Sequence, residues 1–149
     1  MIKHGTHAGS IPATPTKKNI MRKNNKKILY IDMDGVLADF DKRVLEINPS
    51  IVTLSSHAPN YEERSKMVEK VMSDNPRMFL DLEPIQGSIE AVKRLWEHYD
   101  ILFLSTPCWL VPESYMDKRH WIQKYFGDEA KDRLILSQRL CSTFSYLHL

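Results

Sequence analysis

Two aspartates with one residue between them follow a short apolar run near the start of the chain. Residues 28–31 read Ile-Leu-Tyr-Ile, and Asp32, Met33, Asp34 and Gly35 come directly after them. Four consecutive apolar residues, most of them β-branched or aromatic, predict a short strand buried in a parallel sheet. In extended backbone, residues i and i+2 face the same way, roughly 6.6 Å apart at about 3.3 Å per residue. Two carboxylates that close repel each other unless a cation lies between them.

Three interpretations of this Asp-x-Asp-Gly stretch compete. The simplest is a strand followed by a turn, which is the better choice for an isolated sequence of this kind. A calcium-binding EF-hand loop fails, because it needs glycine at its sixth position and glutamate at its twelfth, whereas here glycine is fourth and apolar residues follow. The third is a phosphoryl-transfer site, in which Asp32 attacks phosphorus, Asp34 manages the leaving-group proton and magnesium bridges them to the phosphate.

Further patterns along the chain predict the elements that would position this pair. Residues 101–104 and 134–136 are two more short apolar runs of the type found in buried parallel strands. Helical periodicity marks residues 36–47, a helix opened by Gly87-Ser88, and a helix between Pro112 and Gly127. Strands that alternate with helices predict an α/β fold with a doubly wound, mostly parallel sheet. In such sheets the reactive site lies beyond the carboxyl ends of the strands.

Four spaced segments of the sequence resemble the 5′(3′)-deoxyribonucleotidases, within the haloacid-dehalogenase-like phosphatases. They are residues 32–40 (DMDGVLADF), 82–92 (LEPIQGSIEAV), 103–107 (FLSTP) and 118–127 (KRHWIQKYFG). The resemblance covers about residues 27–139. It implies magnesium-dependent hydrolysis of (deoxy)nucleoside monophosphates to nucleoside and phosphate, through an aspartyl-phosphate on Asp32.

The same resemblance assigns roles to individual residues. It implies that Asp32 and Asp34 are the catalytic pair and hold Mg²⁺, Asp34 through its main-chain carbonyl. Ser105 and Thr106 would bind phosphate oxygens through hydroxyl and main-chain N–H groups, in place of a mere polar strand end. Without the family context Lys118 would be a solvated helix lysine; with it, Lys118 approaches the phosphate.

Phe40 allows two interpretations. It fits the apolar side of the predicted helix at residues 36–47, so it is a candidate packing residue. The family's matching aromatic faces the nucleotide base, which makes Phe40 equally a candidate for substrate binding.

Residues 49–78 interrupt the alternation of strands and helices, and we expect them to form a small helical cap. Asn60 and Glu63 resemble a capping box that opens a helix there. A lid that excludes water strengthens the charge interactions beneath it. The expected division is therefore a core of residues 27–48 and 79–149, with the cap inserted between its two parts.

The formal net charge of +2 conceals an uneven distribution. Residues 1–27 hold seven Lys or Arg and no acid, and the remaining chain carries 14 basic against 19 acidic residues. A basic arm is compatible with nucleic-acid binding, but this one lacks aromatic residues and helical periodicity, so residues 1–26 are expected to be a disordered extension. No apolar run approaches the ~20 residues of a membrane helix. Cys108 and Cys141 form no metal-binding spacing, which favours a reducing cytoplasm.

The C-terminal part departs from the family pattern. Leu140 stands where the family has a lysine, and no acid follows Asp132, so the late pair of aspartates has no counterpart. We therefore expect the C-terminal part of the core to be truncated and hydrolysis by this chain to be weak or absent. Two alternatives stay open: a degenerate, non-catalytic phosphatase-like domain, and a phosphatase for another small phosphate ester.

Overall fold

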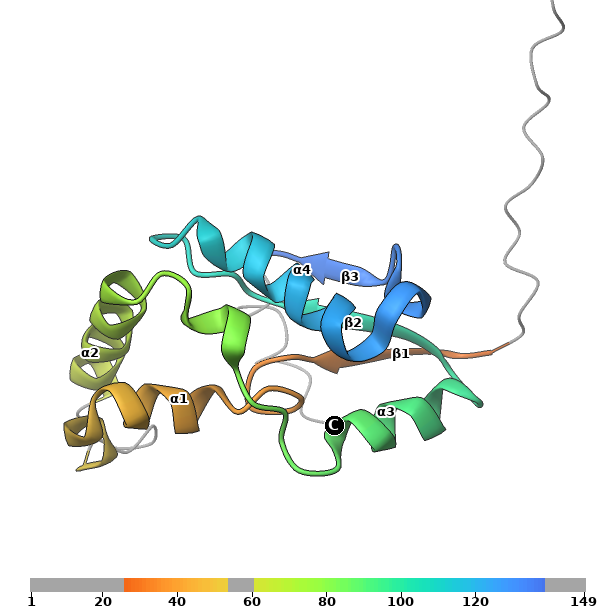
Figure 1. Cartoon of the computed structure of the whole chain (residues 1–149), viewed down its shortest axis with the longest axis horizontal. Helices are drawn as coiled ribbons and strands as arrows, with labels where there is room; N and C mark the ends of the chain where they lie inside the picture. Colours follow the sequence, from red (N-terminus) through yellow and green to blue (C-terminus); the bar gives the residue numbers. More distant parts are fainter. Residues whose placement is uncertain (1–25, 54–60, 139–149) are drawn as a thin grey trace, which may run out of the picture.

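The computed structural model describes residues 26–53 and 61–138 (Figure 1). The expectations for the basic extension up to residue 25, for Asn60 as a helix cap and for the chain after residue 138 lie outside this part. Lys26 is described, and its ammonium donates a hydrogen bond of 2.8 Å to the carbonyl of Trp96. The boundary expected at residue 26 therefore includes one residue that is tied to the core.

Within the described residues, the central element is a sheet of three parallel strands in the order β1-β2-β3. All three predicted strands are present, which confirms the α/β class. The register pairs Asp32 with Leu104, and Ser105 with Leu136. The last residues of the strands therefore lie at the same end of the sheet, where Asp32 and Ser105 are on neighbouring strands. The strands are Ile28–Asp32 (β1), Asp100–Ser105 (β2) and Leu134–Leu136 (β3).

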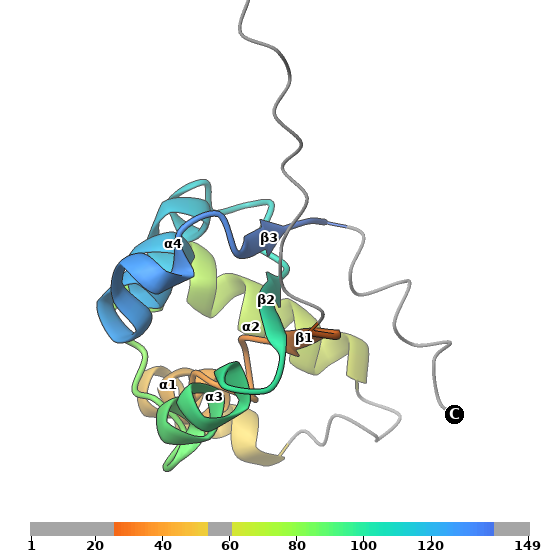
Figure 2. The ribbon, with the colours of Figure 1, turned by 90° about the vertical axis from the view of Figure 1, so that its right-hand side faces the viewer.

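Helices α3 and α4 connect the strands and lie on the same side of the sheet (Figure 2). Right-handed crossovers that step along the sheet in one direction place their helices on one face. Proline before α4 and glycine after it mark the predicted bounds of this helix, since Pro112 is its N-cap and Gly127 its C-cap. The helices are Phe40–Ile47 (α1), Pro49–Thr53 (η1), Tyr61–Asp74 (α2), Met78–Asp81 (η2), Ser88–Trp96 (α3), Glu113–Phe126 (α4) and Gly127–Ala130 (η3).

Helix α1 begins later than the periodicity of residues 36–47 predicts. A tight turn follows β1, with Gly35 at a φ of 73° and the N–H of Ala38 bonded to the carbonyl of Met33 at 2.9 Å. Asp39 then caps the helix, because its side chain accepts a hydrogen bond of 3.1 Å from the N–H of Lys42. The apolar rhythm cannot distinguish this turn from helix, so the predicted start was wrong by four residues.

The hydrophobic core fills the space between the sheet and the helices. Phe103, Trp121 and Phe126 lie on the sheet side, and the same cluster continues to Val68 and Val71 of α2. Residues of the predicted cap segment 49–78 thus contribute to this core. Among the described helices, none has the length and apolar character needed to cross a membrane.

Trp121 offers a test of this packing. It is fully buried, and its indole N–H donates a hydrogen bond of 2.8 Å to the carbonyl of Leu82. We expect Trp121→Phe to lower the free energy of unfolding by about 2 kcal/mol, because the carbonyl loses its donor and the ring loses volume. Urea denaturation measures this. Trp109→Phe is the matched control, since Trp109 is 75% exposed, and an equal loss in both variants would contradict the assignment.

Candidate active site

Asp34, Ser105 and Lys118 meet at the carboxyl ends of β1 and β2. The Lys118 ammonium donates one hydrogen bond to Asp34 Oδ2 and another, of 2.9 Å, to Ser105 Oγ. Ser105 Oγ lies 3.5 Å from the same Asp34 oxygen. In the sequence, Ser105 lies 71 positions after Asp34, and Lys118 lies 84 positions after it. The fold joins these three distant residues in one polar cluster.

Lys118 is buried, and its interpretation as a solvated helix lysine is wrong. Its side chain has no exposed surface, although it belongs to an otherwise ordinary helix. Besides Asp34 and Ser105, the ammonium faces the ring of Phe79, whose centroid is 4.6 Å from Nζ. An ammonium has three donors, so these three partners account for them. Lys118 therefore supports Asp34 and Ser105 from behind the cluster.

Asp34 presents one oxygen that Lys118 does not use. Its Oδ1 is buried and has no hydrogen-bond partner among the described residues, while the side chain as a whole is 28% exposed. A buried carboxylate oxygen without a partner is costly, and it marks a position suited to a substrate, a proton or a cation.

Asp32 is exposed and precedes Asp34 by two residues. Its Oδ1 accepts a hydrogen bond of 2.8 Å from the N–H of Met33. Burial of part of its surroundings raises the pKa of Asp32 above the ordinary 3.8, and the charge of Asp34 adds to this, while the Met33 N–H and Lys118 act in the opposite direction. The structure therefore destabilises the ionised form of Asp32 relative to an aspartate in water.

The other two predicted site residues lie less centrally. Thr106 follows Ser105 directly and is half-buried, but it makes no hydrogen bond or ion pair to the cluster within the described residues. Phe40 is half-buried, with its ring stacked on Phe79 at a centroid distance of 5.7 Å and an interplanar angle of 16°. Its packing role is present in the structure, and its contact with a base stays a prediction.

The oxygen atoms of Asp32 and Asp34 are compatible with a magnesium ion as ligands. Carboxylate and carbonyl oxygens are the ligands this ion prefers, and it commonly takes one or two carboxylates together with substrate phosphate and water. The exposed carboxylate of Asp32 and the main-chain carbonyl of Asp34 would supply two such oxygens, which leaves the buried Asp34 Oδ1 for a proton. In the part of the chain that the structure describes, no group of three or more His, Cys, Asp or Glu gathers to hold a metal. A cation here would depend on these two aspartates and on substrate.

Sequence comparison decides the family. Residues 26–141 match the model of the family described as "5' nucleotidase, deoxy (Pyrimidine), cytosolic type C protein". The chain belongs to this family. In this 5′-nucleotidase family member, the Asp-x-Asp pair, Ser105 and Lys118 all fall inside the matched region.

Individual relatives of this 5′-nucleotidase family member agree. A Vibrio phage KVP40 protein named "Putative 5'(3')-deoxyribonucleotidase" is 35% identical over 125 residues, which cover 84% of this chain and 66% of the relative. The human cytosolic-type 5'(3')-deoxyribonucleotidase is 28% identical over 126 residues, covering 74% and 63%. The chain thus spans slightly under two thirds of these relatives. A solved "putative haloacid dehalogenase-like hydrolase" of Burkholderia xenovorans LB400 is 13% identical with a TM-score of 0.43, covering 80% of this chain and 67% of that one.

Sequence reasoning missed three residues around Lys118. Phe79 covers its ammonium, and Arg77 pairs with the buried Asp117 next to it, with 2.9 Å between Arg77 Nη2 and Asp117 Oδ1. These contacts join η2 to α4 across about 40 residues of chain, and no local pattern reports a contact of that kind. The sequence held one signal for such a contact, the charged Asp117 beside Lys118, which lies on the buried side of α4.

Proposed function

We propose that this protein is a phosphatase for nucleoside monophosphates that works through an aspartyl-phosphate on Asp32. The observation that carries the proposal is the cluster of Asp34, Ser105 and Lys118 beside Asp32, at the carboxyl ends of two parallel strands. Such a cluster combines an exposed nucleophile, a candidate proton carrier and positive charge for an incoming phosphate. The names of the relatives support a nucleotide as substrate.

In the first half-reaction a carboxylate oxygen of Asp32 attacks phosphorus, and the bond from phosphorus to the ester oxygen breaks. The proton that passes to the departing nucleoside oxygen would come from Asp34 Oδ1, the oxygen that Lys118 leaves free. Ser105 and the main-chain N–H groups that follow β2 would hold the phosphoryl oxygens. The products are nucleoside and phosphorylated Asp32.

In the second half-reaction a water molecule attacks the phosphorus of phosphorylated Asp32. Asp34, now ionised, takes the proton of that water, and the bond between phosphorus and Asp32 breaks to release inorganic phosphate. Lys118 would keep Asp34 in place through both steps, because it binds Oδ2 and leaves Oδ1 without a partner. When bound, Mg²⁺ supplies positive charge that offsets the repulsion between Asp32 and the phosphate dianion.

Two further roles belong to this proposal. Phe40 would face the nucleotide base. It stands two residues after the turn of residues 33–38, which carries Asp34, and its ring packs on Phe79, which covers Lys118. Residues 49–78 would act as a cap that limits access of water. A free Cys108 fits the cytoplasmic location that the name of the human relative suggests for the protein.

Phosphate release from a panel of monophosphates tests the proposed function. We expect magnesium-dependent release from deoxynucleoside monophosphates in preference to sugar phosphates, at a rate below about 1 s⁻¹, the low end of ordinary turnover numbers. The low rate follows from Leu140 in the lysine position and from the small set of acids described at the site. A preference for sugar phosphates would show that the substrate is another small phosphate ester.

A non-catalytic nucleotide-binding domain is the second candidate. It is favoured by the finding that, among the described residues, no third acid joins Asp32 and Asp34. Calorimetry with a deoxynucleoside monophosphate separates the two functions. Binding without any phosphate release would support the second candidate, and release that depends on Asp32 would exclude it.

A further inference from the structure

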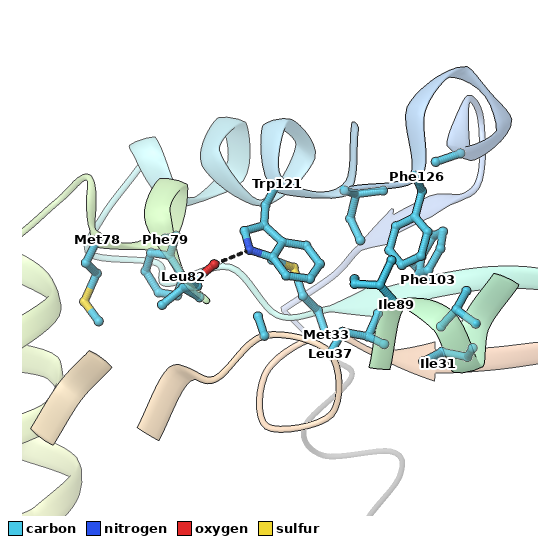
Figure 3. Close-up of a cluster of buried hydrophobic side chains, with 14 of the residues drawn as sticks. Ile31, Met33, Leu37, Met78, Phe79, Leu82, Ile89, Phe103, Trp121 and Phe126 are labelled. Atoms are coloured by element: carbon cyan, nitrogen blue, oxygen red, sulfur yellow. Dashed lines mark hydrogen bonds between the residues drawn. The ribbon is translucent and has the colours of Figure 1, made fainter. Parts of the chain in front are cut away.

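The segment η2 contacts α4 on both sides of Lys118. Before η2, Arg77 Nη2 lies 2.9 Å from Oδ1 of Asp117, which is fully buried. After η2, the carbonyl of Leu82 accepts the hydrogen bond of 2.8 Å from the indole N–H of Trp121 (Figure 3). The residues of α4 that make these two ties, Asp117 and Trp121, flank Lys118 in the sequence. Because both ends of η2 are fixed to α4, the residues between them have a defined position over Lys118.

Phe79 is the residue of η2 that uses this position. Its ring lies over the Lys118 ammonium with 4.6 Å between Nζ and the centroid, and only 2% of the side chain is exposed. A cation over an aromatic face is attracted to the negative charge of the ring, and the attraction grows when water is absent. The ring also stacks with Phe40 at a centroid distance of 5.7 Å, and its burial keeps water away from it.

The ring also replaces a hydrogen-bond partner. Lys118 has three donors and two oxygen partners, Asp34 Oδ2 and Ser105 Oγ. A buried ammonium with an unsatisfied donor would be expensive. The face of Phe79 satisfies the third direction without offering an oxygen that could compete with Asp34.

We propose that Phe79 is a positioning residue, whose ring holds the Lys118 ammonium against Asp34 and Ser105. It does not touch substrate in this role; it acts through Lys118. The functional part rests on the proposed function, in which Asp34 carries the proton and Ser105 holds phosphate. The physical part, protection of Lys118 by the negative face of the ring, is independent of any turnover.

Two variants test the proposal through the chemical reactivity of Lys118. Phe79→Leu removes the ring, whereas replacement of Phe79 by 3,4,5-trifluorophenylalanine keeps its shape and cancels much of its negative face. Trace acylation of the full chain, read by mass spectrometry of the Lys118 peptide, reports how well the ammonium is held. We expect acylation to rise about tenfold in Phe79→Leu and about threefold in the fluorinated protein.

Phe126 provides the matched control. It is a buried phenylalanine of α4 itself, packed on Phe103 and Trp96 and not on Lys118. The same two replacements there should change the acylation of Lys118 less than twofold, although they cost stability. If fluorination of Phe79 leaves the rate of Lys118 acylation within twofold of the wild-type rate, the ring acts through packing alone and the proposal is overturned. This variant decides the question even where Phe79→Leu does not fold.

The readout separates this proposal from the proposed function. A protein that releases no phosphate but shows the expected acylation pattern would refute the phosphatase and keep the role of Phe79. A protein that releases phosphate, but in which fluorination of Phe79 leaves the acylation of Lys118 unchanged, would support the phosphatase and refute the role of Phe79.

Discussion

Lys118→Met should lower the free energy of unfolding by about 3 kcal/mol at neutral pH. Removal of one partner from a buried ion pair leaves the other charge without compensation, which typically costs about 3–5 kcal/mol. We expect the lower end, because the side chain of Asp34 keeps 28% of its surface in water. The Ser105 hydroxyl loses its donor at the same time. Methionine retains the length and apolar stem of lysine, so the packing against Phe79 changes little.

A double-mutant cycle isolates the electrostatic part of this loss. Asp34→Asn in the Lys118→Met background removes the uncompensated charge, and we expect it to restore at least half of the lost stability. Lys124→Met on the same helix is the control, since Lys124 is exposed and should change stability by less than about 0.5 kcal/mol. Urea unfolding of the four proteins measures the cycle. A loss below about 1 kcal/mol in Lys118→Met would show that the pair is not a structural unit.

The result also bears on the charge of the site. Without Lys118, two aspartates would face an incoming phosphate dianion with no protein cation described beside them. Binding of inorganic phosphate should then weaken by at least tenfold, whereas the exposed Lys124 should have no effect. Calorimetry with phosphate gives this number without requiring turnover.

The sequence predicts well those features that depend on neighbouring residues. The three strands follow from short apolar runs, but burial was predicted correctly only for β2. The expectation that residues 28–31 form a buried strand was wrong for one face, since Ile28 and Tyr30 of β1 are 49% and 50% exposed. The bounds of α4 follow from Pro112 and Gly127, whose backbone preferences act locally. The tight turn after Asp34 is different. It is stabilised by main-chain hydrogen bonds that leave the apolar rhythm of residues 36–47 unchanged, so the start of α1 was misplaced.

The residues of the candidate site were likewise predicted only in part. Asp32 and Asp34 were predicted from their place after an apolar strand, and Ser105 from the family resemblance. The structure brings all three to the carboxyl ends of β1 and β2. The burial of Lys118 could not be predicted from its helix, since Arg119 beside it and Lys124 one and a half turns later are exposed. Only the fold places η2 over Lys118, and with it Phe79 and the pair of Arg77 and Asp117.

Asp32→Asn should abolish phosphate release while leaving the fold at least as stable as the wild type. An amide is not a nucleophile toward phosphorus, so we expect the rate to fall by at least about a thousandfold, to the background of the assay. Asn keeps the shape of Asp and its ability to accept the N–H of Met33. Release that persisted in Asp32→Asn would show that the nucleophile lies elsewhere.

The difference in stability between Asp32→Asn and the wild type should depend on pH in a defined direction. Because the folded-state pKa of Asp32 is raised above 3.8, the folded protein holds this proton more tightly than the unfolded chain, and ionisation of Asp32 costs stability. The wild type loses this stability as the pH rises from about 3.8 through the raised folded-state pKa, and Asp32→Asn does not. The variant should therefore match the wild type near pH 3.5 and exceed it at neutral pH by about 0.5 kcal/mol, a small value because water screens the exposed carboxylate.

Magnesium should reverse the order of the two proteins at neutral pH. An ion that binds only the folded state stabilises it by mass action, and the Asp32 carboxylate is one of the oxygens that would hold it. We expect millimolar MgCl₂ to raise the melting temperature of the wild type and to leave that of Asp32→Asn nearly unchanged. Asp41→Asn is the control, since it removes an exposed carboxylate that pairs with Arg64 away from the cluster. An equal response of wild type and Asp32→Asn to magnesium would mean that the ion binds elsewhere, and the repulsion between Asp32 and phosphate would then have no counterion.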